Sequence, residues 1–229
     1  MKRSRVNEIL LEGDAFIRSF GYVMPPFAYW TPDEFRARRS EAAGILDGKL
    51  GWDITDFGAG RFEALGLFLF TARNGNPADL AAGRGRLYAE KIMIAQKDQV
   101  TPMHRHLVKA EDIINRGGGT LTLELFAADA AGAIDRGADV AVPSDGVLRA
   151  LPAGGKLRLE PGESVTLLPG VWHSFWGEGA DVLVGEVSTV NDDLTDNVFA
   201  DPVGRFAEIE EDEDPVHLLV SDYERWLAA

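Results

Sequence analysis

The chain has 229 residues, with 37 acidic against 23 basic side chains and a formal net charge of −14 at pH 7. A surface this acidic repels phosphate backbones and anionic membranes, so neither nucleic acid nor a lipid bilayer is expected as a partner. The lack of cysteine excludes disulfides, thiolate nucleophiles and thiolate metal ligands. The length and the lack of any linker predict a single domain over 1–229.

The first part of the chain, 1–50, predicts a helical extension. Apolar residues recur at helical spacing over 4–20. A second helix is expected after Thr31, which suits the N-cap, with Pro32 at the first helical position and Glu34 at the third. Early acidic residues and the lack of a long apolar run argue against a signal peptide or a membrane span, so a cytoplasmic protein is expected.

Short strand-like segments joined by tight turns fill 51–220. The candidate strands are 66–72, 87–95, 120–127, 156–160, 163–169, 172–176 and 181–188. Many short strands at close spacing predict an antiparallel barrel or sandwich, so the fold class is an all-β core with flanking helices. The three glycines 117–119 predict a tight hairpin. The last residues, 221–229, predict a closing helix.

Two of the four histidines stand one residue apart in "TPMHRH". Because residues i and i+2 of a strand point to the same face, His104 and His106 can direct both imidazoles at one point. Glu111 follows after enough chain for a turn, and His173 follows the turn sequence "LLPG". Three imidazoles and a carboxylate suit Mn²⁺, Fe²⁺, Co²⁺, Ni²⁺ or Zn²⁺ with positions left open for substrate. A lone pair of histidines is also found on strand surfaces, so the predicted metal site depends on all four residues.

Two blocks of the sequence resemble the two motifs of the cupin superfamily. They are "HxH-x4-E-x6-G", from His104 to Gly118, and "PGESVTLLPGVWH", which ends at His173. The resemblance implies a double-stranded β-helix barrel of jelly-roll type. Asp98 stands where cupins usually have glycine, and the second block is one residue shorter than its commonest form. Neither departure changes a ligand.

Longer stretches are similar to the D-lyxose isomerase family within that superfamily. They include "GWDITDFG", "YAEKIMI", "KAEDIINRGGG", "NDDLTDNVF" and "GRFAEIEEDE". The resemblance implies a Mn²⁺-dependent aldose–ketose isomerase that converts D-lyxose to D-xylulose, often together with D-mannose to D-fructose. It also implies that the metal ligands are His104, His106, Glu111 and His173.

Such a reaction moves a proton between C2 and C1 of the sugar and therefore needs a base and a group that handles hydroxyl protons. Lys109 lies two residues before Glu111, and its ammonium suits stabilisation of an enediolate, although a solvated lysine is the alternative. An acidic run such as 208–215 usually forms a solvated loop. The family resemblance instead implies that this run contributes to the pocket wall. We predict Glu208 from this run as the base.

Four further residues are candidate substrate contacts, each with a structural alternative. They are Arg205, Glu211, Asp193 and Trp172. Pairing with an acid is the alternative for Arg205, core packing for Trp172, a polar turn for Asp193 and a solvated loop for Glu211. The polar turn is also the preferred interpretation of Asn115 and Asp192, whereas His217 is expected to be structural.

Two other functions fit the same ligands. A cupin non-haem iron dioxygenase also uses three histidines and a glutamate, but it usually has a more apolar pocket. A non-catalytic cupin that binds a sugar or a metal is the second alternative. The N-terminal helices are a plausible surface for pairing two barrels, so a homodimer is expected.

Overall fold

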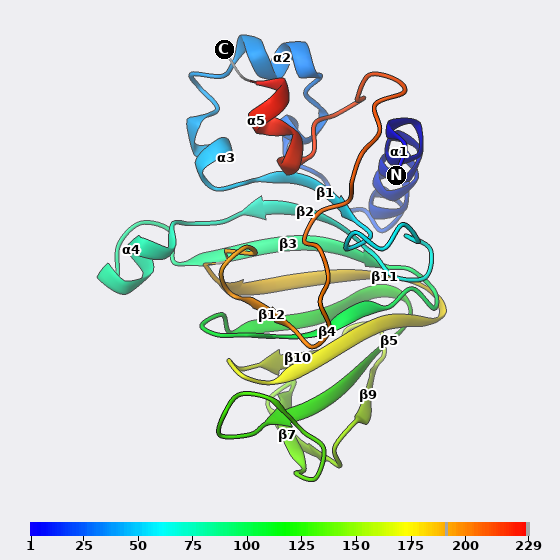
Figure 1. Ribbon diagram of the computed structural model, residues 1–229, viewed down its shortest axis with the longest axis vertical. Coiled ribbons are helices and arrows are strands. Elements are labelled where there is room, and N and C mark those ends of the chain that lie inside the picture. The colour runs from blue at the N-terminus through cyan, green and yellow to red at the C-terminus, as the bar shows by residue number, and fades with distance from the viewer. Residues whose placement is uncertain (191, 228–229) are drawn as a thin grey trace.

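The structure is a computed structural model that describes residues 1–190 and 192–227. Its centre is a curled, mainly antiparallel sheet (Figure 1). The strands are β1 (Gly51–Thr55), β2 (Leu67–Arg73), β3 (Tyr88–Ala95), β4 (Thr101–His106), β5 (Glu111–Ala128), β6 (Ile134–Asp135), β7 (Val140–Ser144), β8 (Val147–Leu151), β9 (Gly155–Leu159), β10 (Ser164–Leu167), β11 (Trp172–Thr189) and β12 (Asn197–Phe199). The helices are α1 (Arg3–Ser19), η1 (Pro26–Tyr29), α2 (Pro32–Ala37), α3 (Ala43–Asp47), α4 (Pro77–Ala82), η2 (Val220–Asp222) and α5 (Tyr223–Trp226).

The sheet confirms the predicted β-barrel architecture. Its strands follow the order β1-β2-β3-β11-β4-β12, and β5 also pairs with β6, β9, β10 and β11. Strand β11 spans both the segment 172–176 and the segment 181–188, which the sequence predicted as separate strands. It pairs with β3, β4 and β5 and therefore joins the segments that carry the candidate ligands.

The three glycines 117–119 lie inside β5, so the predicted hairpin at this point is wrong. Gly118 has a φ of +101°, and a Cβ there would lie 2.1 Å from the carbonyl oxygen of Asp181 on β11. The buried Asn115 side chain donates hydrogen bonds to the carbonyls of Gly119 and Leu159, which fixes the backbone next to the glycines. The glycines therefore allow β5 to pass close to β11, where the pairing register shifts.

Side chains on the central strands alternate between two apolar layers, as the strand period requires. The outer layer faces α1 and η1 and includes Trp52, Phe68, Phe70, Ile92, Ile94 and Leu183. The inner layer includes Leu69, Met93, Leu121, Leu123, Leu125, Val182 and Val184. Asp53, Lys91 and Glu186 are buried at positions of the inner set. The barrel interior is therefore apolar along most of its length and charged in one region.

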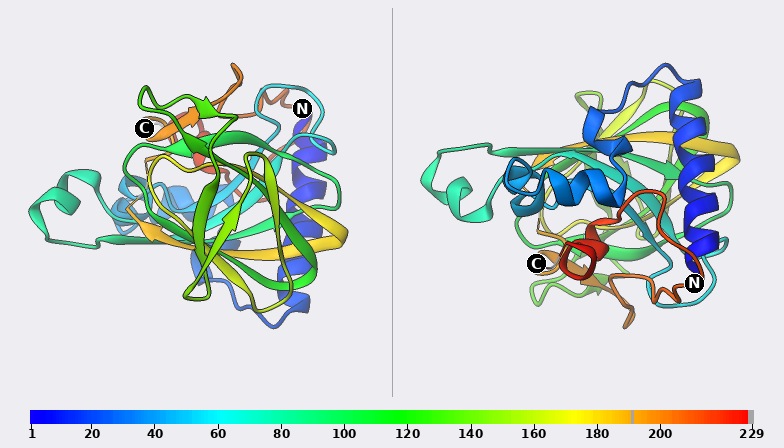
Figure 2. Two further views of the ribbon diagram at one scale, coloured as in Figure 1. Left: turned by 90° about the horizontal axis from the view of Figure 1, so that it is seen from below. Right: turned by 90° about the horizontal axis from the view of Figure 1, so that it is seen from above.

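Helix α4 projects away from the sheet, whereas the other helices lie at one end and along one side of it (Figures 1 and 2). Helix α1 lies along the side, whereas α2, α3 and α5 gather at the end next to β1 (Figures 1 and 2). The capping box of Thr31 and Glu34 is confirmed, but α2 ends at Ala37 and the helical path resumes only in α3. The predicted closing helix is shorter than expected, and its last residues, 228–229, lie outside the described residues. Among the described residues, no helix combines the length and the apolar composition needed to span a membrane.

Candidate functional site

Three histidines converge inside the barrel. His104 and His106 are two positions apart on β4 and therefore share one face of the strand. His173 at the start of β11 is the cross-strand partner of His104. Each offers a ring nitrogen, and these atoms lie within 4.8 Å of one another. Glu111, at the start of β5, places Oε1 3.1 Å from His106 Nε2 and 3.3 Å from His173 Nε2. Four potential ligand side chains therefore meet at one place.

Backbone carbonyls orient two of the rings. His104 Nδ1 lies 2.8 Å from the Pro102 carbonyl and His173 Nδ1 lies 3.1 Å from the Val171 carbonyl. Because a carbonyl only accepts, Nδ1 carries the proton and Nε2 keeps its lone pair. Burial, reinforced by the neighbouring His173 and His106, lowers the pKa of His104 well below its ordinary value. The His104 ring is thus held neutral, as metal ligation requires.

The donor atoms fit a bound cation. Among the described residues, His106 Nε2 and Glu111 Oε1 are buried without a properly aligned hydrogen bond, although they lie close together. Buried polar atoms without partners are rare in folded proteins and point to an ion or ligand at the site. His104, His106, His173 and Glu111 are therefore the residues that can hold a divalent metal.

Lys109 lies beside this candidate metal site. Its Nζ is 2.6 Å from Glu111 Oε2 and 3.1 Å from Glu186 Oε1. Burial disfavours the ammonium, but the carboxylates of Glu111 and Glu186 outweigh burial and raise the pKa of Lys109. Burial likewise opposes ionisation of Glu111, and the Lys109 ammonium holds the pKa of Glu111 well below its ordinary value.

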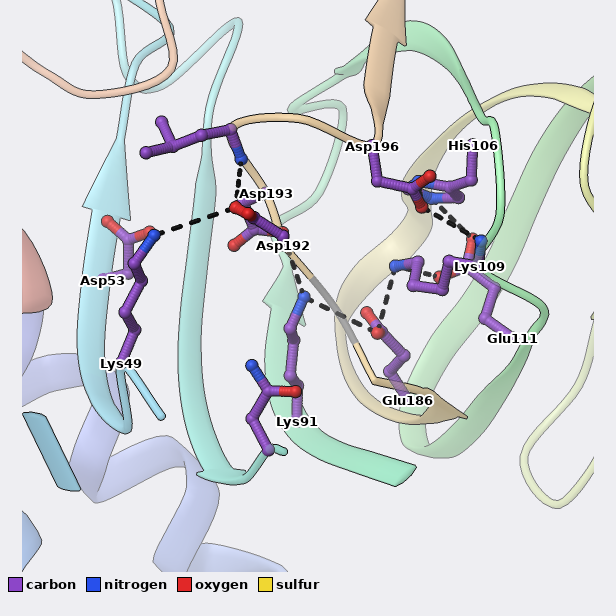
Figure 3. A network of polar contacts seen from close by, with 12 residues as sticks. Lys49, Asp53, Lys91, His106, Lys109, Glu111, Glu186, Asp192, Asp193 and Asp196 are labelled. Atoms are coloured by element: carbon purple, nitrogen blue, oxygen red, sulfur yellow. Dashed lines mark hydrogen bonds and ion pairs between the residues drawn. The ribbon is translucent and has the colours of Figure 1, made fainter. Parts of the chain in front are cut away.

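Charges of alternating sign continue from this pair, and Figure 3 shows Lys109, Glu186 and Lys91 among them. In order they are Glu111, Lys109, Glu186, Lys91, Asp193, Arg205 and Asp53. Between neighbours, the nitrogen–oxygen distances are 2.6, 3.1, 3.6, 3.3, 2.7 and 2.7 Å. Buried charges in such an arrangement compensate one another and leave a polar wall that can bind hydroxyl groups.

Most of the predicted site residues line the same cavity. They are His104, His106, Lys109, Glu111, His173, Asp193 and Arg205. Thr55, Thr101 and Asn197 add polar groups to the cavity, and Phe57, Phe175 and Phe199 add aromatic rings. The pairing of Arg205 with an acid, considered as an alternative to substrate binding, is present together with its position in the cavity.

Glu208 and Glu211 do not line the cavity, which disagrees with the expectation that the acidic run forms a pocket wall. Glu208 is exposed. Glu211 accepts hydrogen bonds from Arg3 at 2.8 and 2.9 Å, and Asp212 accepts from the backbone and hydroxyl of Ser4. The acidic run lies beside the start of α1, because its carboxylates pair with the basic side chain and the unpaired backbone amide there.

The candidate substrate contact Trp172 also lies outside the cavity lining. Its indole nitrogen donates to the Gly132 carbonyl, and the guanidinium of Arg105 stacks over its ring at 5.4 Å. Asp192 is likewise absent from the cavity and lies 3.7 Å from Lys49. His217 Nδ1 lies 3.1 Å from the Trp30 carbonyl, at the helical end of the molecule.

The sequence interpretation missed Lys91 and Glu186, which both line the cavity. They face each other on β3 and β11 in the pairing register, and each side chain is only 4% exposed. The available signal was a charge at an inward position of an otherwise apolar strand, in "EKIMIA" and "VGEVS". That signal requires knowing which face of each strand is inside.

Fold and site together define a class, namely a cupin-like barrel with a candidate three-histidine metal site in its interior. Solved structures of similar fold include the Cellulomonas parahominis L-ribose isomerase with L-ribose, at a TM-score of 0.60 and 18% identity, and the Acinetobacter sp. DL28 L-ribose isomerase in complex with L-ribose, at 0.62 and 15%. Each comparison covers 92% of this chain and 98% of the other. At such low identity the likeness concerns the fold.

Sequence comparison gives the family. The D-lyxose isomerase family profile matches residues 1–223. A D-lyxose/D-mannose isomerase of Serratia proteamaculans is 49% identical over 231 aligned positions, with both chains covered completely. One of Escherichia coli O157:H7 is 46% identical, covering 99% of this chain and 100% of its own. The chain belongs to the D-lyxose isomerase family and is an aldose–ketose isomerase, as the sequence motifs predicted.

Proposed function

We propose that this protein interconverts D-lyxose and D-xylulose, and also D-mannose and D-fructose, with a divalent cation for which Mn²⁺ is the first candidate. The names of the two full-length relatives support the choice of sugars. The observation that carries the proposal is the buried group formed by Glu111, Lys109 and Glu186 beside the three histidines. It combines a potential metal ligand, a fixed positive charge and a further carboxylate in one cavity.

The four ligand side chains provide the metal position in this proposal. A cation held by His104, His106, Glu111 and His173 would supply Lewis-acid polarisation of the sugar carbonyl. The same ligands accept several first-row ions, so the ligand set alone does not select manganese. Metal analysis of the purified protein, with Co²⁺, Fe²⁺, Ni²⁺ and Zn²⁺ compared in activity, tests this part separately.

Glu186 is the proposed base in place of Glu208. Its carboxylate accepts the proton as the C2–H bond breaks and returns it to C1 as the new C–H bond forms. Lys109 supplies positive charge to the enediolate oxygens between these two steps. The lysine is fixed between Glu111 and Glu186, so it needs no rearrangement to act when negative charge develops.

The remaining charged wall is the proposed sugar-binding surface. Lys91 and Arg205 can donate to hydroxyl oxygens, and Asp193 can accept from hydroxyl groups. Their mutual ion pairs hold them in place before the substrate arrives, which reduces the entropy cost of binding. A pocket wall this polar supports a polyhydroxy substrate over the apolar substrates typical of the dioxygenase alternative.

The test is ketose formation from D-lyxose and D-mannose by chelator-treated protein, with and without added Mn²⁺. Glu186→Gln should lose turnover by at least about a hundredfold while keeping metal affinity. Glu178→Gln on the same strand is the matched control, because Glu178 is partly exposed, pairs with Arg158 and does not line the cavity. Stoichiometric metal binding without turnover of any aldose would remove the isomerase proposal, and oxygen consumption would then favour the dioxygenase.

Assembly and location are separate parts of the proposal. We infer a homodimer, as expected from the exposed N-terminal helices, and light scattering of the purified protein measures its mass directly. The predicted cytoplasmic location is checked by cell fractionation.

A further inference from the structure

Asp196 lies beside the metal-ligand strand but is not one of the four ligand side chains. It immediately precedes β12, which pairs with β4 so that Asn197 is opposite His106 and Phe199 is opposite His104. The residue is buried, with 8% of its surface exposed. Its position at the end of this ladder places its carboxylate next to the turn that follows His106 (Figure 3).

The Asp196 carboxylate accepts hydrogen bonds from three consecutive backbone amides. Oδ1 accepts from Leu107 at 3.1 Å and from Val108 at 2.7 Å, and Oδ2 accepts from Lys109 at 3.0 Å. The carbonyl of Asp196 also accepts from Leu107. One aspartate therefore satisfies the whole turn between the ligand His106 and the Lys109 side chain, with charge-assisted bonds.

The same carboxylate lies near Nδ1 of His106. His106 Nδ1 lies 3.7 Å from Asp196 Oδ2, an electrostatic contact that is too long for a hydrogen bond. The other two ligand rings donate through Nδ1 to backbone carbonyls, whereas among the described residues His106 Nδ1 has no such partner. Ligand histidines commonly have a second partner that fixes the ring orientation, and for His106 the carboxylate occupies that position.

We propose that Asp196 is a positioning residue that sets the direction of His106 and Lys109 together. Its carboxylate touches neither substrate nor metal; it fixes the turn between the two residues and provides a negative group behind the His106 ring. The part that concerns metal affinity and turnover rests on the proposed function, whereas the part that concerns the order of the turn does not.

The test compares Asp196→Ala and Asp196→Asn with Asp201→Asn, which changes an exposed acid on the same segment. Hydrogen exchange at the Leu107–Lys109 amides is measured on metal-free protein, and Mn²⁺ binding is measured by calorimetry. Asp196→Ala should speed exchange at these amides and weaken Mn²⁺ binding about 10- to 100-fold. Asp196→Asn keeps one acceptor oxygen and should lie between wild type and Asp196→Ala. Asp201→Asn should match wild type in both measurements.

A kinetic measurement separates positioning from a merely structural role. If Asp196 positions Lys109, kcat falls in Asp196→Asn by a larger factor than KM changes, because Lys109 acts on the developing charge. A lower melting temperature with unchanged Mn²⁺ affinity and an unchanged kcat would overturn the proposal. If Asp196→Ala does not fold, the decisive variant is Asp196→Asn. The proposal is overturned if Asp196→Asn has the same amide exchange rates and the same Mn²⁺ affinity as wild type. Wild-type protein that binds no Mn²⁺ would reject the proposed function, while exchange at the amides would still decide whether Asp196 orders the turn.

Discussion

Lys109 and Glu186 join two distant parts of the chain inside the barrel, with Nζ and Oε1 3.1 Å apart although the residues are 77 positions apart in sequence. The side chains are 3% and 4% exposed. Lys109 belongs to the turn between two candidate ligands, and Glu186 belongs to the central strand β11. The pair therefore couples the geometry of the candidate metal site to the strand that also carries His173. Lys109 also pairs with Glu111 and Glu186 also pairs with Lys91, so removing either partner leaves the other buried charge less fully compensated.

Lys109→Met should lower both activity and stability. The substitution leaves Glu111 and Glu186 without their shared ammonium, so unfolding free energy should fall by about 3–5 kcal/mol. If Lys109 acts as proposed, loss of its positive charge should lower kcat/KM by roughly 10²- to 10⁴-fold. Urea unfolding and ketose assays measure the two effects.

A double variant distinguishes these two consequences. Lys109→Met with Glu186→Gln removes a negative charge as well and should recover part of the stability without recovering turnover. Lys97→Met, at an exposed lysine, is the control and should behave like wild type. Full activity in Lys109→Met would contradict any role of its ammonium in the reaction.

Removal of metal should lower thermal stability as well as activity. A cation that binds only the folded chain adds about 2.7 kcal/mol at a concentration one hundred times its dissociation constant. Chelator-treated protein should therefore melt at a lower temperature and recover on addition of Mn²⁺, whereas His173→Ala should show no such recovery. His217→Gln changes the fourth histidine, whose ring contacts Trp30 instead, and should respond to Mn²⁺ like wild type. Equal Mn²⁺ stabilisation of the His173→Ala variant would exclude His173 as a ligand.

The barrel class and the histidine cluster could be predicted because their signals are local. Alternating leucines mark β5, and the spacing of His104 and His106 places both rings on one strand face. His173 lies far along the sequence from this pair, so its prediction depended on the second cupin-like block, which ends at His173. The glycines 117–119 misled because glycine serves a hairpin and a close strand approach equally, and only the position of β11 distinguishes the two.

Glu208 and Glu211 lie outside the cavity lining for a long-range reason. The acidic run is paired with the start of α1, and 208 positions separate Arg3 from Glu211 in sequence. No short-range pattern shows that these carboxylates satisfy the first turn of a helix at the other end of the chain. Glu186 was missed for a different reason. Its strand was predicted, but the sequence did not show that Glu186 points into the barrel.

The Glu211 carboxylate predicts an acid-sensitive contribution to stability. The hydrogen bond from Arg3 is the largest factor that lowers the pKa of Glu211 below its ordinary value of 4.5, and the charges of Arg3 and Arg225 add to it. A carboxyl whose folded pKa is depressed stabilises the fold above about pH 4.5, and this contribution is lost as pH falls through the folded pKa. Glu211→Gln should therefore lower the unfolding free energy by about 1–3 kcal/mol at pH 7.

The pH profile is the informative part of that measurement. The difference between wild type and Glu211→Gln in urea unfolding should shrink as pH falls below 4.5, because the wild-type carboxyl becomes neutral too. Glu41→Gln, at an exposed acid away from the start of α1, serves as the control with little effect at either pH. A constant difference across the whole range would mean that Glu211 acts through packing and not through its charge.

Gly118→Ala tests whether the approach of β5 to β11 is required. The backbone there has a φ of +101°, and a new Cβ would lie 2.1 Å from the Asp181 carbonyl oxygen, which is part of the backbone and cannot rotate away. The strained backbone alone costs of the order of 1–3 kcal/mol, and the clash forces the two central strands apart. Gly44→Ala in α3, where a Cβ meets nothing within 4 Å, should instead raise stability by about 0.5–1 kcal/mol. Urea midpoints compare the two alanines directly. Strand β11 carries His173 and Glu186 on either side of this contact, so Gly118→Ala should also weaken Mn²⁺ binding. A folded variant with a normal urea midpoint and normal Mn²⁺ affinity would show that the two strands tolerate a wider separation.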